Sequence, residues 1–219
     1  MSLSFETNRE RPLEGKTVFV SASIPDPVRW TGQVDPLEIT DAVVSMARVF
    51  LTAGANLVTA AHPTIAPLLL YVAAELPPEY GQQIITYQSD LFEDVLPPAT
   101  RRFQDEKIGR FVWTPAAPNE RPEPGHWHES LAIMRREMLE QSCPSAAVFV
   151  GGMEGIRDEF ALFADLCPHA PTYPIGRPGG EARTLAEVSD LPIHAELSES
   201  AIYPALWRHV IADLRGHSS

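Results

Sequence analysis

The sequence predicts an α/β protein with a Rossmann-like three-layer fold, in which a mostly parallel sheet carries helices on both faces. Short apolar runs of strand length alternate along the chain with segments whose apolar residues follow helical spacing. Such alternation is typical of a parallel sheet covered on both sides. One apolar run, 146–150, also leads into a glycine pair and then a helix, which adds a strand–turn–helix unit.

The elements of the first half follow from local signals. Pro25 and Pro27 end the first strand, because proline cannot continue a strand ladder. Asp35 is the expected N-cap of the next helix, with Pro36 at its first position and Gly54 just past its C-terminal end. Expected strands are 16–24, 56–61, 83–87 and 110–114, and a second helix is expected over 65–74.

The second half continues the alternation after a proline-rich loop, 115–125. Helical spacing of apolar residues predicts helices, and apolar runs predict strands. The expected order is a helix at 128–141, a strand at 146–150, a helix at about 157–167, a strand at 170–175, a loop at 176–180 and a terminal helix at 200–214.

Length and composition limit the class of protein. The 219 residues suit one domain over 16–219, preceded by an N-terminal extension over 1–15. A net charge of −12 argues against a general surface for nucleic acid or anionic membranes. The polar N-terminus, the lack of a long apolar run and the two cysteines predict a cytoplasmic protein with reduced core thiols, Cys143 and Cys167.

Ligands of parallel α/β sheets bind at the carboxyl ends of strands, near the point where strand order reverses. Ser21 and Ser23 end the first strand, and His62 follows the second. The turn at Gly151 and Gly152 points backbone N–H groups and a helix N-terminus at one place, which favours an anion such as phosphate. Each of these three features also has a purely structural interpretation. The serines can cap the turn, the histidine can bond to backbone, and the glycine turn can be a tight connection without ligand.

Other chemistry finds little support. His126 and His128 alternate as metal ligands can, but no third ligand is spaced nearby, so we expect no metal. No Walker A pattern, GxSxG elbow or kinase motif occurs. We therefore expect no bound cofactor.

The region around 128–167 resembles the SLOG superfamily, which unites Smf-type DNA-processing proteins with lonely-guy-type phosphoribohydrolases. The resemblance rests on Arg135 in a helix, the strand at 146–150, and Gly151-Gly152 sixteen residues after that arginine. It implies a nucleotide or nucleoside-phosphate ligand. In catalytic members an arginine and a glutamate act on an N-glycosidic bond. The resemblance also implies pairing into a homodimer through helices near the site.

The glycine turn departs from the family's PGGxGTxxE pattern. Val150 replaces the proline, and Glu154-Gly155-Ile156 stands where the family has Gly-Thr, with Gly155 a further candidate for ligand contact. Asp158 holds the family glutamate's place by spacing, whereas Glu159 has the right residue type. Neighbouring helical residues face about 100° apart, so only one of these acids can point into the site.

The sequence thus predicts a module that binds a nucleotide or nucleotide-derived small molecule, acting as a sensor without turnover. The alternative is a hydrolase or transferase at the N-glycosidic bond of nucleoside monophosphates. In that alternative Asp158 or Glu159 orients water and offsets oxocarbenium charge, while Arg135 holds the phosphate or ribose.

Overall fold

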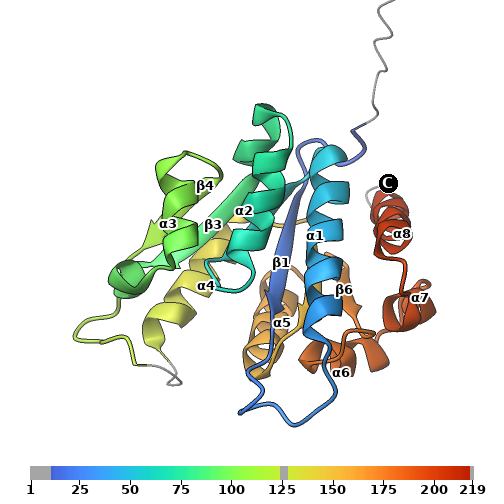
Figure 1. Cartoon of the computed structure of the whole chain (residues 1–219). Coiled ribbons are helices and arrows are strands. Elements are labelled where there is room, and N and C mark those ends of the chain that lie inside the picture. Colours follow the sequence, from blue (N-terminus) through green and yellow to red (C-terminus); the bar gives the residue numbers. More distant parts are fainter. Residues whose placement is uncertain (1–10, 124–127, 218–219) are drawn as a thin grey trace, which may run out of the picture.

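A computed structural model describes residues 11–123 and 128–217. Within them, one sheet of six strands is parallel at every pairing, in the order β4-β3-β2-β1-β5-β6 (Figure 1). The strands are β1 (Thr17–Ser23), β2 (Asn56–Ala60), β3 (Ile84–Ser89), β4 (Arg110–Thr114), β5 (Ala146–Gly151) and β6 (Thr172–Ile175). The Rossmann-like expectation is confirmed.

Helices cover both faces of this sheet, so the fold has three layers (Figure 1). The helices on the first face are α1 (Pro36–Thr52), α2 (Ala66–Glu75), α3 (Pro98–Asp105), α7 (His194–Glu199) and α8 (Tyr203–Gly216). Those on the second face are α4 (Glu129–Ser142), α5 (Glu154–Leu166) and α6 (Glu181–Glu187). Two short 3-10 helices, η1 (Pro78–Gln83) and η2 (Asp90–Val95), flank β3.

The core forms on both sides of β1 because successive side chains of a strand point to opposite faces. Val18 and Val20 pack towards α1 and α8, whereas Phe19 packs towards α4 and α5. The Phe19 ring stacks on Phe163 of α5 at 6.0 Å and meets Phe149 of β5 edge-on at 6.1 Å. The two apolar layers therefore fix the sheet between them.

The strand order reverses at β1. From there the chain builds β2, β3 and β4 outward on one side and then returns to add β5 and β6 on the other. The register pairs Ser23 with Gly151 at the carboxyl ends of β1 and β5. The predicted ligand edge of the sheet, the lower edge in Figure 1, is consequently centred on these two strands.

Several local expectations are confirmed. The side chain of Asp35 accepts hydrogen bonds from the N–H groups of Leu37 and Glu38, which caps α1. Gly54, with φ of +97°, follows the end of that helix. The described part of the proline-rich loop, 115–123, contains no helix or strand.

Other boundaries differ from expectation. Helix α5 begins at Glu154 rather than near residue 157, and α3, α6 and α7 were not expected. The described end of the N-terminal extension packs on the domain, since Leu13 is 1% exposed and its N–H bonds to the Ala53 carbonyl. A single domain over 16–219 remains a prediction. In the described ranges, no helix has the length and apolarity that crossing a bilayer requires.

Candidate functional site

A cavity of about 620 Å³ opens at the carboxyl edge of the sheet. Its walls come from the ends of β1, β2 and β3, from η2 and the loop before α3, and from the N-terminal halves of α4 and α5. Seven of the expected site residues line it: Ser21, Ser23, His62, Arg135, Gly155, Asp158 and Glu159. The fold thus brings together residues that lie up to 138 positions apart in the chain, as in the Ser21–Glu159 pair.

The centre of the cavity wall is a linked triad. Arg135 on α4 donates from Nε to Oε1 of Glu159 on α5 at 2.8 Å. Ser21 at the end of β1 donates its hydroxyl to Oε2 of the same carboxylate at 2.5 Å. The Arg135 and Glu159 side chains are only 18% and 13% exposed. Both carboxylate oxygens are therefore occupied and held in a fixed orientation.

The two neighbouring acids have different surroundings. Glu159 is the one bonded to Arg135 and Ser21, while Asp158 is exposed at the rim of the same cavity. Their separation follows from the 100° turn between adjacent helical residues. The carboxylate with the family's residue type therefore lies beside the arginine, and the one with the family's spacing does not.

The glycine pair, which was expected to bind an anion, has a structural role in the turn after β5. Gly151 and Gly152 have φ of +66° and +73°, a region that glycine enters without strain. The Gly152 N–H donates to the Ser23 carbonyl at 2.8 Å, so this amide is already used by the protein. A Cβ on Gly180 would lie 2.5 Å from the Gly151 carbonyl carbon. The turn allows β1, β5 and the loop before α6 to approach one another.

Neither Gly151 nor Gly152 lines the cavity described above. The N-terminus of α5, one step further along the chain, does. Met153, Glu154 and Gly155 form this part of the wall, and no side chain caps the helix. Amides in the first turn of a helix have no partner within the helix. The backbone N–H groups at the cavity therefore belong to the start of α5 and not, as expected, to the diglycine turn.

Gly155 leaves room for the arginine. A Cβ at this position would lie 3.2 Å from Nη2 of Arg135, so the guanidinium packs directly against the start of α5. At the mouth of the cavity, Arg29 lies 4.0 Å from Glu154, and both side chains are largely exposed. This outer pair contributes little stability because water screens it.

His62 lies two residues past the end of β2 and is half-buried in the cavity wall. Burial and the positive charge of Arg135 lower the pKa of His62 from 6.5 to about 4, so the ring is neutral at neutral pH. The Thr64 hydroxyl lies 2.9 Å from Nδ1. The histidine therefore presents a neutral imidazole beside a guanidinium.

One wall of the cavity was missed by sequence reasoning. It is mainly apolar and comes from η2, the loop before α3, and α4. Its residues are Phe92, Val95, Pro97, Leu131 and Met134, with Gln88 and Thr59 as polar neighbours. No short motif marks such a wall, because the segments meet only in the folded sheet.

A metal site finds no support among residues 11–123 and 128–217, where no three histidine, cysteine, aspartate or glutamate side chains gather suitably. His126 lies outside these described residues. The His128 Nε2 accepts a hydrogen bond from the Glu123 N–H, and its ring meets Phe92 edge-on at 5.2 Å. His128 is therefore engaged in packing.

Comparison with known proteins identifies a matching family and a solved structure of similar fold. A family model described as the SLOG cluster3 family matches residues 29–211. Among solved structures, the X-ray structure of TM1055, a structural genomics target, is similar with a TM-score of 0.53 at 16% sequence identity. The similarity covers 79% of this chain and 81% of that one, and at this identity it shows the fold alone. A search of curated proteins finds no match.

Proposed function

The chain belongs to the SLOG cluster3 family, and from this premise we propose that it binds a nucleotide or nucleotide-derived small molecule as a sensor or binding module. The observation that carries the proposal is the Arg135–Glu159–Ser21 triad in a cavity at the point of strand-order reversal. Ligands of open parallel sheets bind at such points.

The triad leaves suitable donors for a ligand. The pairing with Glu159 uses the Nε–H of Arg135, so the two Nη groups are the donors that a phosphate or ribose would take. The first-turn amides of α5 at Glu154 and Gly155 line the same cavity. Together they offer a guanidinium and a helix N-terminus to one anion.

The charge balance limits the anion. The lining side chains include two arginines, Arg29 and Arg135, and three acids, Glu154, Asp158 and Glu159. A site with more carboxylates than cationic side chains repels a ligand that carries a large negative charge. We therefore propose a nucleoside or nucleoside monophosphate rather than a triphosphate, with the carboxylates facing sugar hydroxyls. The apolar wall around Phe92 and Met134 suits a base.

Isothermal titration calorimetry with nucleosides and their mono-, di- and triphosphates tests the proposal. We expect at least one monophosphate to bind, and binding to weaken in Arg135→Ala. The matched control is Arg136→Ala, since Arg136 is the adjacent arginine but is exposed and pairs with Glu140 at 3.4 Å. Absence of binding for the whole panel, or equal affinities of both variants and the parent protein, would refute the assignment.

A second candidate function is hydrolysis or transfer at the N-glycosidic bond. The orientation of Glu159 favours it, because Arg135 and Ser21 fix a carboxylate on the cavity wall. Such a carboxylate can orient water or offset oxocarbenium charge. The test is release of free base from nucleoside monophosphates, followed by chromatography. Release that is abolished in Glu159→Gln but retained in Asp158→Asn supports turnover; binding without release supports the sensor.

A further inference from the structure

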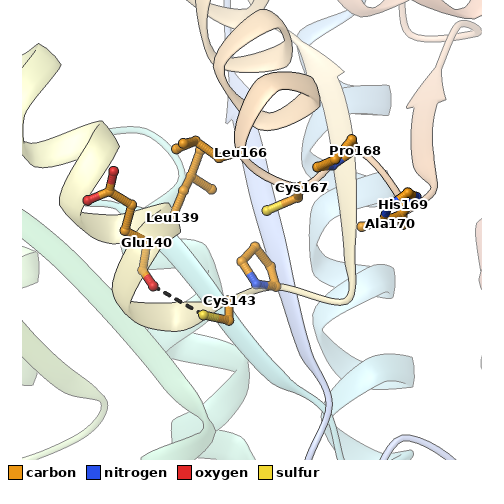
Figure 2. A pocket seen from close by; sticks show the side chains of 9 residues that line it. Leu139, Glu140, Cys143, Leu166, Cys167, Pro168, His169 and Ala170 are labelled. Carbon is orange, nitrogen blue, oxygen red and sulfur yellow. Dashed lines mark hydrogen bonds between the residues drawn. The ribbon is translucent and has the colours of Figure 1, made fainter.

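A second cavity, of about 470 Å³, lies at the opposite edge of the sheet from the candidate site, near the starts of β5 and β6 (Figure 2). Both cysteines of the chain line it, beside His169 and the apolar side chains of Leu139 and Leu166. The sequence predicted two core thiols. Cys143 is instead exposed, and Cys167 is partly exposed.

The two cysteines have equivalent positions in the fold. Cys143 is the C-cap of α4 and Cys167 the C-cap of α5, and each is followed by a proline. Their N–H groups bond back to Leu139 and Phe163, respectively. Because both residues lie past the last helical position, a shift of either one breaks at most this final N–H bond and leaves the rest of its helix intact.

The two cysteines have the same spacing in the sequence as the ion pair of Arg135 and Glu159. Cys143 follows Arg135 by eight residues, and Cys167 follows Glu159 by eight. At 1.5 Å per residue, both cysteines lie about 12 Å further along their helices. The ion pair joins α4 and α5 near their N-terminal halves, at the carboxyl edge of the sheet. The C-terminal ends of the same two helices line one cavity at the opposite edge of the sheet.

From this arrangement we propose that Cys143 and Cys167 are a reversible redox pair that forms an intramolecular disulfide joining the C-terminal ends of α4 and α5. A disulfide needs Cα atoms about 4.4–6.8 Å apart. The bridge therefore requires the ends of α4 and α5, which line the same cavity, to bring the two cysteines within that distance. The proposal is independent of which ligand the candidate site takes.

The order of reaction follows from exposure. Figure 2 shows the Cys143 thiol directed to the Glu140 carbonyl, to which it donates a weak hydrogen bond at 3.1 Å. A hydroperoxide meets this exposed thiol first. Burial, with a smaller effect of Cys143, raises the pKa of the Cys167 thiol, which keeps it protonated and less reactive towards oxidant. Cys167 is therefore the resolving thiol.

The chemistry balances with hydrogen peroxide as oxidant. The Cys143 thiolate attacks one peroxide oxygen, the O–O bond breaks, and sulfenic acid and hydroxide form, the latter taking up the thiol proton as water. The Cys167 sulfur then attacks the sulfenic sulfur, the S–O bond breaks, and a second water leaves. Two thiols are oxidised and one peroxide is reduced. A thiol reductant reverses the bond.

The test uses the full chain, which has no other cysteine. After peroxide treatment we expect both thiols to become unreactive towards a thiol dye, and the intact mass of the monomer to fall by two hydrogen atoms. Peptide mapping without reductant should recover the segments of Cys143 and Cys167 as one species, and dithiothreitol should restore both thiols. In Cys167→Ser, the sulfenic acid at Cys143 should persist and be trapped by dimedone.

Three outcomes would overturn the proposal. They are a monomer mass that rises by oxygen atoms while no bridge forms, disulfide-linked dimers in place of the intramolecular bond, and two thiols that both stay reactive. The Cys143→Ser variant controls for direct oxidation of the inner thiol. If Cys167 oxidises as fast in this variant as Cys143 does in Cys167→Ser, the assigned order is wrong.

Discussion

Arg135 and Glu159 form a 2.8 Å hydrogen-bonded ion pair that joins α4 to α5 across the wall of the candidate site. The pair is mostly shielded from water, and Ser21 completes it from the end of β1. Three elements of the fold are thus fixed at one carboxylate. The first three predictions test the residues of this edge of the sheet.

Arg135→Ala should weaken binding of a nucleoside monophosphate by about 2 kcal/mol, or roughly 30-fold in Kd, because a charge-assisted hydrogen bond is lost. It should also lower the free energy of unfolding by about 1–2 kcal/mol, since Glu159 loses its partner in a shielded position. Calorimetry and urea unfolding measure the two effects. Arg136→Ala should leave both nearly unchanged, and an equal effect there would contradict the assigned role.

Ligand charge should matter in one direction. With three acids and two arginines around the cavity, a nucleoside triphosphate should bind at least about tenfold more weakly than the matching monophosphate at low salt. Raising the ionic strength should narrow the gap, because salt screens the repulsion. Titration of both ligands at two salt concentrations provides the measurement. Tighter binding of the triphosphate would mean that the carboxylates do not face it.

The stability of the protein should depend on pH through His62. Its pKa is about 4 in the folded state and 6.5 in the unfolded chain, so only the unfolded chain takes up a proton between these values. The free energy of unfolding should therefore fall as pH drops from 6.5 towards 4, by up to about 3 kcal/mol. Urea unfolding of the parent protein and His62→Asn across this range isolates the effect. Parallel pH profiles would contradict it.

Gly180→Ala should strongly destabilise the fold. The added Cβ would lie 2.5 Å from the Gly151 backbone, at a φ of +72° that disfavours alanine. We expect a loss of about 3 kcal/mol or more, from backbone strain and overpacking. Gly81→Ala is the control, because its Cβ would meet nothing within 4 Å. Thermal unfolding of both variants compares them, and similar melting temperatures would show that the contact can relax.

Local sequence signals predicted most of the fold. Asp35, Pro36 and Gly54 set the limits of α1, because caps and breakers act within a few residues. Apolar runs located all six strands to within a few residues. The short helices α3, α6 and α7 were missed, since a helix of two turns carries too few residues for periodicity to show.

The site was predicted in part. Ser21 and His62 follow from the rule that parallel strands expose their carboxyl ends at one edge, whereas Arg135 follows from the resemblance to the SLOG superfamily. All three line the cavity. The sequence could not show that the Gly152 amide is already hydrogen-bonded. Its acceptor is the Ser23 carbonyl, which belongs to a strand far away in the sequence. The apolar wall around Phe92 could likewise not be predicted from the sequence.

By itself, the sequence determined the alternation of elements, the parallel sheet and the edge at which chemistry-bearing side chains gather, since these follow from local propensity and from the rules of chain connection. The tertiary structure alone decided that Glu159 rather than Asp158 meets Arg135, and that Cys143 and Cys167 share a cavity. Both outcomes depend on how α4 and α5 are rotated and placed against each other. Long-range packing of the core sets that placement, and no short stretch of sequence encodes it.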